Sequence, residues 1–224
     1  KNVLAGGLIS IPFRAEGKWD SFEVRPVPAE EVDADLLRDL KARGLKAGPR
    51  LAVGDGALGF WSALDQAYPE TRHQRCWFHK MGNVLDKLPK RLQGKAKRIL
   101  RDIYHSESRE EAEEHIETFR ATFSPRQQKA VDCLTKDREQ LLTFFDYPAE
   151  HWWHLRTNNP IESAFANVRL RQRITKGSGT RKKALTMAFK LLDMAQRHWR
   201  RLNGPEFLPL VWDGVTFVNG AMPE

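Results

Sequence analysis

The clearest pattern in the chain is a short apolar run, Leu51–Val53, that stops at a Gly-Asp-Gly turn containing Asp55. Such a run bounded by a turn is typical of a buried strand. The apolar residues that follow have helical spacing: Leu58, Trp61, Leu64 and Tyr68. A second strand-like piece then ends in Cys76–His79. The pattern therefore predicts that Asp55 lies at the carboxyl end of a buried strand, where open α/β sheets bind ligands.

Upstream of this strand, the pattern predicts a hairpin and a helix. Leu4–Phe13 and Phe22–Val27 are the two strand candidates, with a polar turn around Gly17 between them. A helix over Asp35–Arg43 places three leucines on one face and leads into the strand at Leu51. We therefore expect a β–helix–β connection, a partly parallel sheet and an α/β fold.

Beyond His79 the pattern becomes helical. Ser108 opens one helix with an S-x-x-E capping box, and a long helix is expected over Pro125–Phe145. A third helix begins in Asn-Pro-Ile-Glu, with Asn159 at the N-cap and Glu162 at the third helical position. Two roles for Glu162 are open at this point: it caps the helix, or it is a site carboxylate that pairs with Asp55.

Charge separates the end of the chain from the rest. The chain has 37 Lys and Arg against 29 Asp and Glu, a net charge of +8. Residues 163–203 alone contain eleven basic residues and one acidic residue, or +10. A cluster of this kind favours contact with a phosphate backbone, and a solvated basic face is the alternative. The residues we assign to this surface are Arg169, Arg171, Arg173, Lys176, Arg181, Lys182 and Lys183.

We expect these basic residues to occupy a loop between two helices, over Arg169–Lys183. The second of these helices is expected over Lys183–Leu202, with six of its side chains buried: Leu185, Ala188, Leu191, Leu192, Ala195 and Trp199.

Two further observations limit the class of protein. No apolar run approaches the ~20 residues that a membrane-spanning helix needs, so a membrane partner is not expected. Two cysteines are too few for a disulfide framework and favour a reducing compartment.

Cys76 and His79 have the C-x-x-H spacing of half a zinc site. The other ligands would have to come from Cys133 or from the pair His151 and His154. A buried cysteine beside aromatic residues belongs more often to a core, so we favour a structural role for this pair over zinc.

Several blocks resemble the DDE transposases of bacterial insertion sequences in the IS256 family, which is related to the eukaryotic Mutator group. The resemblance covers about Asp35–Gly220 and is carried by LLRDLKARGLKAGPRLAVGDGALGFWSAL, QRCWFHKMGNVLDKLPK, CLTKDREQLLTFFDYPAEHWWHLRTNNPIESAFANVRLR and AQRHWRRLNG. It implies an RNase H-like core with a helical insertion between the second and third catalytic carboxylates.

The resemblance also implies a chemistry and partners. Asp55 matches the second catalytic Asp and Glu162 the catalytic Glu, and both would be ligands of Mg²⁺ or Mn²⁺. The implied function is metal-dependent cleavage and strand transfer of DNA during transposition. The implied partners are terminal repeats, target DNA and further copies of the chain, in the bacterial cytoplasm at the nucleoid.

The family's first catalytic Asp lies several tens of residues before the Asp-Gly turn, which is further back than the chain reaches. We therefore expect an N-terminally incomplete core, and a truncated, catalytically inactive DNA-binding remnant is the alternative function. The predicted divisions are an atypical segment over 1–34 that does not match the family, the remaining α/β core over 35–80, the helical insertion over 81–155, and a helical part with Glu162 and the basic segment over 156–224.

Overall fold

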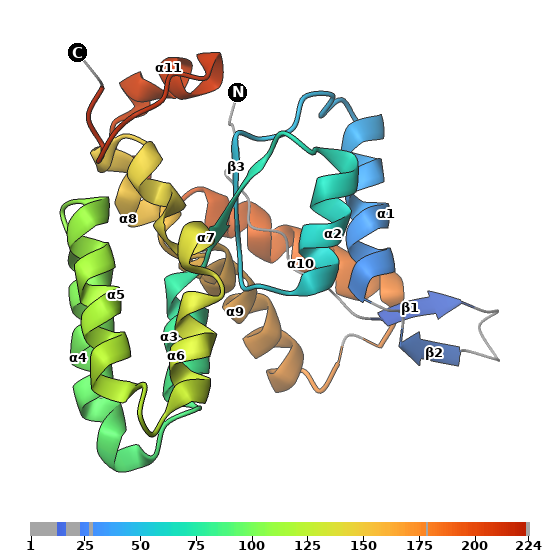
Figure 1. Ribbon diagram of the computed structural model, residues 1–224. Coiled ribbons are helices and arrows are strands. Elements are labelled where there is room, and N and C mark those ends of the chain that lie inside the picture. Colours follow the sequence, from blue (N-terminus) through green and yellow to red (C-terminus); the bar gives the residue numbers. More distant parts are fainter. Residues whose placement is uncertain (1–12, 17–22, 27–28, 178, 223–224) are drawn as a thin grey trace.

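The computed structural model describes residues 13–16, 23–26, 29–177 and 179–222. The described part is mostly helical and contains two small sheets. No helix in these ranges is long and apolar enough to cross a membrane. In Figure 1, α1, α2 and β3 lie on one side, the helices from α3 to α7 on the other, and α9 and α10 behind and between them.

The strand predicted at Leu51 is confirmed, and the structure shows that it pairs with the second strand-like segment. Strand β3 (Leu51–Gly54) pairs in parallel with β4 (Arg72–Arg75), and Gly54 lies opposite Arg75. Helix α2 (Leu58–Ala67) forms the crossover between them. This arrangement aligns the carboxyl ends of both strands, so residues that come after Gly54 and Arg75 meet at one edge.

The expected hairpin is present in the described residues but belongs to a separate sheet. Strand β1 (Phe13–Glu16) pairs with β2 (Glu23–Pro26) in antiparallel fashion, whereas residues 4–12 of the first predicted strand lie outside the described ranges. Helix α1 (Ala29–Ala42) begins earlier than predicted and packs on α2. The expectation that the hairpin and the Leu51 strand share a partly parallel sheet was therefore wrong.

A helical part follows β4. Its elements are α3 (Trp77–Leu85), α4 (Lys90–His105), α5 (Arg109–Phe123), α6 (Gln128–Thr135), α7 (Arg138–Leu142) and α8 (Trp152–Leu155). One apolar core joins these helices, and its largest buried side chains include Trp77, Phe119 and Phe144. A second, smaller core lies between α1, β3 and α2. The capping box at Ser108 is confirmed, since its hydroxyl accepts from the Glu111 N–H at 3.1 Å.

Two predicted elements of this region are wrong. The second strand stops at Arg75, and Cys76 is the N-cap of α3, so His79 lies on a helix. The long helix over Pro125–Phe145 is broken into α6, α7 and a short 3-10 helix (Thr143–Asp146). The break falls at Asp137, whose backbone leaves the helical region (φ −112°, ψ 24°) and whose carboxylate bonds to Lys80.

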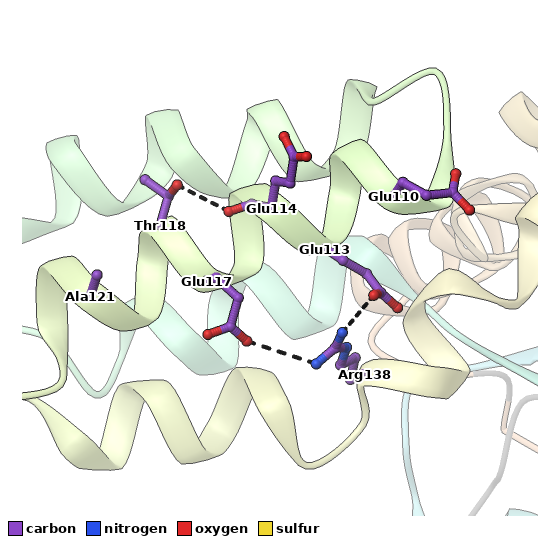
Figure 2. A pocket seen from close by; sticks show the side chains of 7 residues that line it. All are labelled: Glu110, Glu113, Glu114, Glu117, Thr118, Ala121 and Arg138. Carbon is purple, nitrogen blue, oxygen red and sulfur yellow. Dashed lines mark hydrogen bonds and ion pairs between the residues drawn. The ribbon is translucent and has the colours of Figure 1, made fainter.

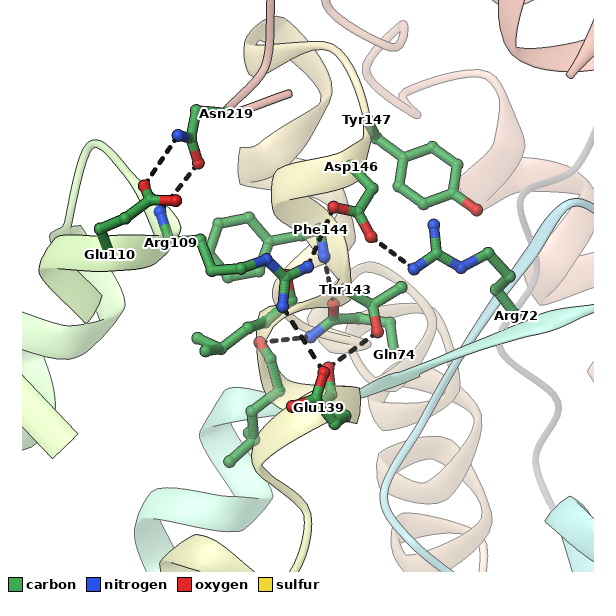
Figure 3. A network of polar contacts seen from close by, with 12 residues as sticks. Arg72, Gln74, Arg109, Glu110, Glu139, Thr143, Phe144, Asp146, Tyr147 and Asn219 are labelled. Carbon is green, nitrogen blue, oxygen red and sulfur yellow. Dashed lines mark hydrogen bonds and ion pairs between the residues drawn. The ribbon is translucent and has the colours of Figure 1, made fainter. Parts of the chain in front are cut away.

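A polar network fastens β4 to the helical part (Figure 3). The side chain of Gln74 is fully buried; its amide nitrogen donates to the Leu141 carbonyl at 3.2 Å and its oxygen accepts from the Phe144 N–H at 2.8 Å. Asp146 forms ion pairs with Arg72 of β4 and with Arg109 of α5, the latter at 2.9 Å. Because buried polar groups are costly unless paired, this network fixes the sheet edge against the helices.

The chain ends with α9 (Asn159–Ile174), α10 (Arg181–Gln196), a short 3-10 helix (Pro205–Phe207) and α11 (Leu208–Asp213). Helix α10 ends six residues earlier than predicted and has no buried residue in the described part. Four of its predicted core residues are half-buried, whereas Leu185 and Trp199 are exposed. The prediction that these six side chains are buried was therefore wrong: four are partly covered and two are exposed.

Candidate active site

Asp55 occupies the position predicted from the sequence, directly after β3 and at its carboxyl end. Its side chain is exposed, and Oδ1 accepts from the Ala57 N–H at 3.0 Å. This Asx turn carries the chain from the strand into α2. Gly56 makes the turn at φ +92°, a conformation that favours glycine.

The Cys-x-x-His block links the Asp55 strand to Glu162 through successive contacts. The backbone N–H of Cys76 donates to the Gly54 carbonyl at 2.7 Å. The Cys76 thiol donates to Oδ1 of Asn158 at 3.0 Å, and His79 Nδ1 lies 3.4 Å from the same sulfur. His79 Nε2 lies 3.5 Å from Oε1 of Glu162. The block therefore connects Gly54, the residue before Asp55, to Glu162.

Glu162 is not placed as the capping box requires. The N-cap of α9 is Asn158 instead of the predicted Asn159, so Glu162 is the fourth helical residue. Asn158 makes no side-chain cap and instead receives the Cys76 thiol. The Glu162 carboxylate, with 41% of its side chain exposed, lies beside His79. This geometry leaves the carboxylate accessible to solvent and ligands.

The donor set at this site is chemically suited to a hard cation. Asp55 and Glu162 both present carboxylate oxygens, which Mg²⁺ and Mn²⁺ prefer. Within the described ranges, however, no three His, Cys, Asp or Glu side chains form a group that could hold a metal ion. Asp55 and Glu162 are therefore two carboxylates of the predicted kind that belong to no such group within the described residues.

The five residues considered for zinc are not brought together. Cys76 and His79 contact each other, but His151 Nε2 lies 2.9 Å from the Gly204 carbonyl oxygen. His154 Nε2 accepts from the Asn203 N–H at 3.2 Å. The fifth residue, Cys133, lies on α6.

Three charged residues behind the Asp55 turn were missed by the sequence reasoning. The guanidinium of Arg75 contacts the Gly54 carbonyl and packs so closely on the turn that a Cβ at Gly56 would lie 2.2 Å from Cζ. Arg75 Nε and Lys80 Nζ share Oδ2 of Asp137, at 3.2 and 2.7 Å. Lys80 is only 1% exposed. Its spacing from Trp77 and Val84 on α3 was the available signal, because all three lie on one helix face.

Burial lowers the pKa of Lys80, and the hydrogen bond and charge of Asp137 oppose this shift. Burial also acts to raise the pKa of Asp137, but the hydrogen bond and charge of Lys80 outweigh it and hold that pKa below its usual value. The pair therefore keeps both charges in a nearly buried position and anchors the break between α6 and α7 beneath the Asp55 turn.

All seven predicted DNA-contact residues are exposed, but they do not form the predicted loop. Arg169, Arg171 and Arg173 lie on α9, Lys176 lies in the following turn at φ +53°, and the three residues from Arg181 open α10. Helices α9 and α10 pack on each other, so the seven residues lie on two neighbouring helices and the segment between them, which we call the basic surface. Because α9 also carries Glu162 in its first turn, the surface extends away from the candidate site along the same helix.

A separate acidic groove lies on α5 (Figure 2). Glu113 and Glu117 face Arg138, at 2.7 and 3.8 Å from its guanidinium nitrogens. The groove is completed by Glu110, Glu114, Thr118 and Ala121. Its negative charge would repel phosphate, and it contains none of the predicted site residues.

The chain is similar to known proteins. Residues 8–201 match the Mutator family of transposases. The chain is 46% identical to the transposase for insertion sequence element IS6120 of Mycolicibacterium smegmatis, over 97% of the chain and 68% of that protein. It is 46% identical to the transposase for IST2 of Acidithiobacillus ferrooxidans, over 95% of the chain and 73% of that protein. The transposase for IS1081 of Mycobacterium tuberculosis is 26% identical, over 91% of the chain and 49% of that protein.

Proposed function

Because this chain belongs to the Mutator family of transposases of bacterial insertion sequences, we propose that it cleaves and joins DNA at a site formed by Asp55 and Glu162. The proposed framework is an RNase H-like core, of which β3, α2 and β4 are part, with a helical insertion before Glu162. The divisions at residues 34, 80 and 155 remain predictions; the family match begins at residue 8.

The observation that carries this proposal is the contact path from Gly54 through Cys76 and His79 to Glu162. It connects Glu162 to the residue before Asp55, although the two carboxylates are 107 positions apart in the sequence (162 − 55). A purely structural glutamate at a helix start would be expected to bond to the cap backbone. The proximity of Glu162 to a histidine of the block after β4 instead supports a shared site.

Mg²⁺ or Mn²⁺ held by the two carboxylates would activate the attacking oxygen and stabilise the leaving oxygen of an in-line displacement at phosphorus. The chain's own contribution is to orient the ligands. The Asx turn holds Oδ1 of Asp55, and His79, 3.5 Å from the Glu162 carboxylate, would help to position it. Groups held in this way react faster because little reorganisation is needed in the transition state.

We further propose that the basic surface of α9 and α10 binds the DNA backbone near this site. Lys182 and Lys183 are exposed in the first turn of α10. If both contact phosphates, replacing them with Ala should reduce the slope of log K against log salt by about 2. Transposition brings two DNA ends together, so we expect binding by more than one copy of the chain. An unchanged slope would remove these two lysines from the contact surface.

The test of the catalytic assignment is a Mg²⁺-dependent nicking assay with the whole chain and a labelled duplex carrying candidate element ends. Glu162→Gln and Asp55→Asn are expected to abolish cleavage while salt-sensitive DNA binding is retained. Glu114→Gln, on the exposed acidic face of α5, is the matched control and should cleave normally. Unimpaired cleavage by either site variant would refute the assignment.

A second function, a DNA-binding remnant without catalysis, is favoured by one observation. The described residues supply two carboxylates and no group of three potential ligands. Binding without cleavage by the unaltered chain, under conditions where an intact relative cleaves, would support this second function over the first.

A further inference from the structure

A small cavity lies beside the start of α9, next to the candidate active site. Its volume is about 290 Å³, and its lining residues are Tyr104, Trp153, His154, Thr157 and Asn159. Tyr104 lies at the end of α4, Trp153 and His154 on α8, Thr157 between α8 and α9, and Asn159 at the first position of α9. Asn159 precedes Glu162 by three helical residues, or about 4.5 Å along the helix axis. The cavity therefore opens within reach of a strand positioned at Glu162.

The aromatic walls of this cavity differ in how firmly they are held. The ring of Tyr104 packs edge-on against Trp77, with centroids 6.2 Å apart, and the Arg156 guanidinium lies 4.9 Å from the Tyr104 ring centre. Trp153 is 66% exposed. Its neighbour Trp152 is buried and donates to the Tyr147 carbonyl. The fold thus uses one of the two adjacent tryptophans for its core and leaves the other on the cavity wall.

The polar groups of the cavity can recognise a flat ligand by its edge. Thr157 offers a hydroxyl and Asn159 an amide, each able to donate and accept. His154 Nε2 accepts from the Asn203 N–H, so the neutral ring carries its proton on Nδ1 and can donate there. Aromatic faces combined with a few donors and acceptors are the features that recognise a nucleobase.

A fixed positive charge lies behind the Tyr104 wall. Arg156 is 8% exposed, and its Nε has no hydrogen-bond partner among the described residues. The guanidinium is enclosed by the rings of Tyr104, Phe144 and Trp152, at 4.5 to 5.2 Å from their centres. This buried cation gives the cavity a positive potential, which favours an anionic strand over a neutral ligand.

We propose that this cavity receives an unpaired base of the DNA strand being processed, stacked on Trp153 and Tyr104 and contacted at its edge by Thr157 and Asn159. The inference rests on the proposed function, since it requires DNA at Glu162. An enzyme that acts near a strand end gains access by taking a base out of the stack, and an aromatic pocket offsets the lost stacking.

The test is a double-mutant cycle between the protein and the DNA, measured by fluorescence anisotropy with the whole chain. One labelled duplex carries a short single-stranded extension, and a second carries the same extension with its bases removed as abasic residues. For the unaltered chain, loss of the bases should weaken binding about tenfold, which is the size of one aromatic stacking interaction. For Trp153→Ala this difference should shrink markedly, with a remainder from Tyr104 and the edge contacts, whereas Trp153→Phe should restore most of the difference.

Trp212→Ala is the matched control, since Trp212 is also an exposed tryptophan (54%) but lies on α11. The Trp212→Ala variant should still bind the duplex with intact bases about tenfold more tightly than the abasic duplex. Equal binding of both duplexes by the unaltered chain, with salt-sensitive duplex binding intact, would overturn the base pocket and leave the proposed function standing. Absence of any salt-sensitive DNA binding would instead overturn the proposed function, and the base pocket with it.

Discussion

The substitution Asp137→Asn tests whether the buried charges behind the Asp55 turn hold the fold together. Lys80 is 1% exposed and lies 2.7 Å from Asp137, so loss of the carboxylate charge leaves the ammonium buried without an anionic partner. Breaking a buried pair in this way costs about 3 to 5 kcal/mol. The Asp137 side chain is 25% exposed, and water can solvate part of the site, so we expect about 3 kcal/mol, the lower end of that range.

The assay is urea unfolding at pH 7. With a slope of about 2 to 3 kcal/mol per M, the expected loss moves the midpoint down by about 1 to 1.5 M. Lys80→Met combined with Asp137→Asn should recover part of the loss, because an apolar side chain replaces the buried ammonium while Arg75 still lacks its carboxylate partner. Asp39→Asn is the control: its partner Arg43 is 72% exposed, and exposed pairs contribute less than about 1 kcal/mol.

The same pair predicts a pH dependence. The pKa of Asp137 is lower in the folded than in the unfolded chain, so the carboxylate stabilises the fold at pH values above its unfolded pKa of about 4. This stabilisation is lost as pH falls through the lower folded pKa. The difference in free energy of unfolding between the unaltered chain and Asp137→Asn should therefore reach its full size at pH 7 and shrink below about pH 4. Equal midpoints for Asp137→Asn and Asp39→Asn at pH 7 would refute the reasoning.

Three further substitutions test other parts of the structure. Gly56→Ala places a Cβ 2.2 Å from Arg75 Cζ at φ +92° and should cost at least about 1 kcal/mol, measured as a lower thermal midpoint; an unchanged midpoint would contradict the packing of the turn. Ser108→Ala removes the cap of α5 and should cost about 1 kcal/mol in the same assay, whereas Ser108→Asp should cost little. His79→Ala removes the contact with Glu162 and should slow cleavage at least about tenfold while duplex binding stays unchanged. Weakened duplex binding with normal cleavage would show that His79 does not position Glu162.

Local patterns in the sequence determined several features correctly. The apolar run that stops at Asp55 is strand β3, and the S-x-x-E motif at Ser108 is a formed cap. Strand and cap signals are local, because they depend on apolar periodicity and on side chains that bond to backbone a few residues away. The family was also predicted from the sequence: three of the four blocks that carry the resemblance to IS256 and Mutator transposases lie within residues 8–201, which match the family, and the fourth begins inside that range.

Boundaries that depend on distant partners could not be predicted in this way. The helix over Pro125–Phe145 breaks at Asp137 because its carboxylate binds Lys80, 57 residues earlier. Asn158 becomes the N-cap in place of Asn159 while its side chain receives the thiol of Cys76. Helical periodicity contains no information about such partners, so the predicted boundaries were wrong at these positions.

The sequence by itself determined the apolar strand before Asp55, the cap at Ser108 and the basic character of residues 163–203, since each depends on neighbouring residues. Only the tertiary structure decided that His79 lies between the Asp55 strand and Glu162, and that Lys80 is buried on Asp137. The first contact forms because a parallel strand pair directs the residues after each strand to one edge of the sheet. The second forms because a buried charge is costly unless it is paired, and the folded chain brings Asp137 next to Lys80.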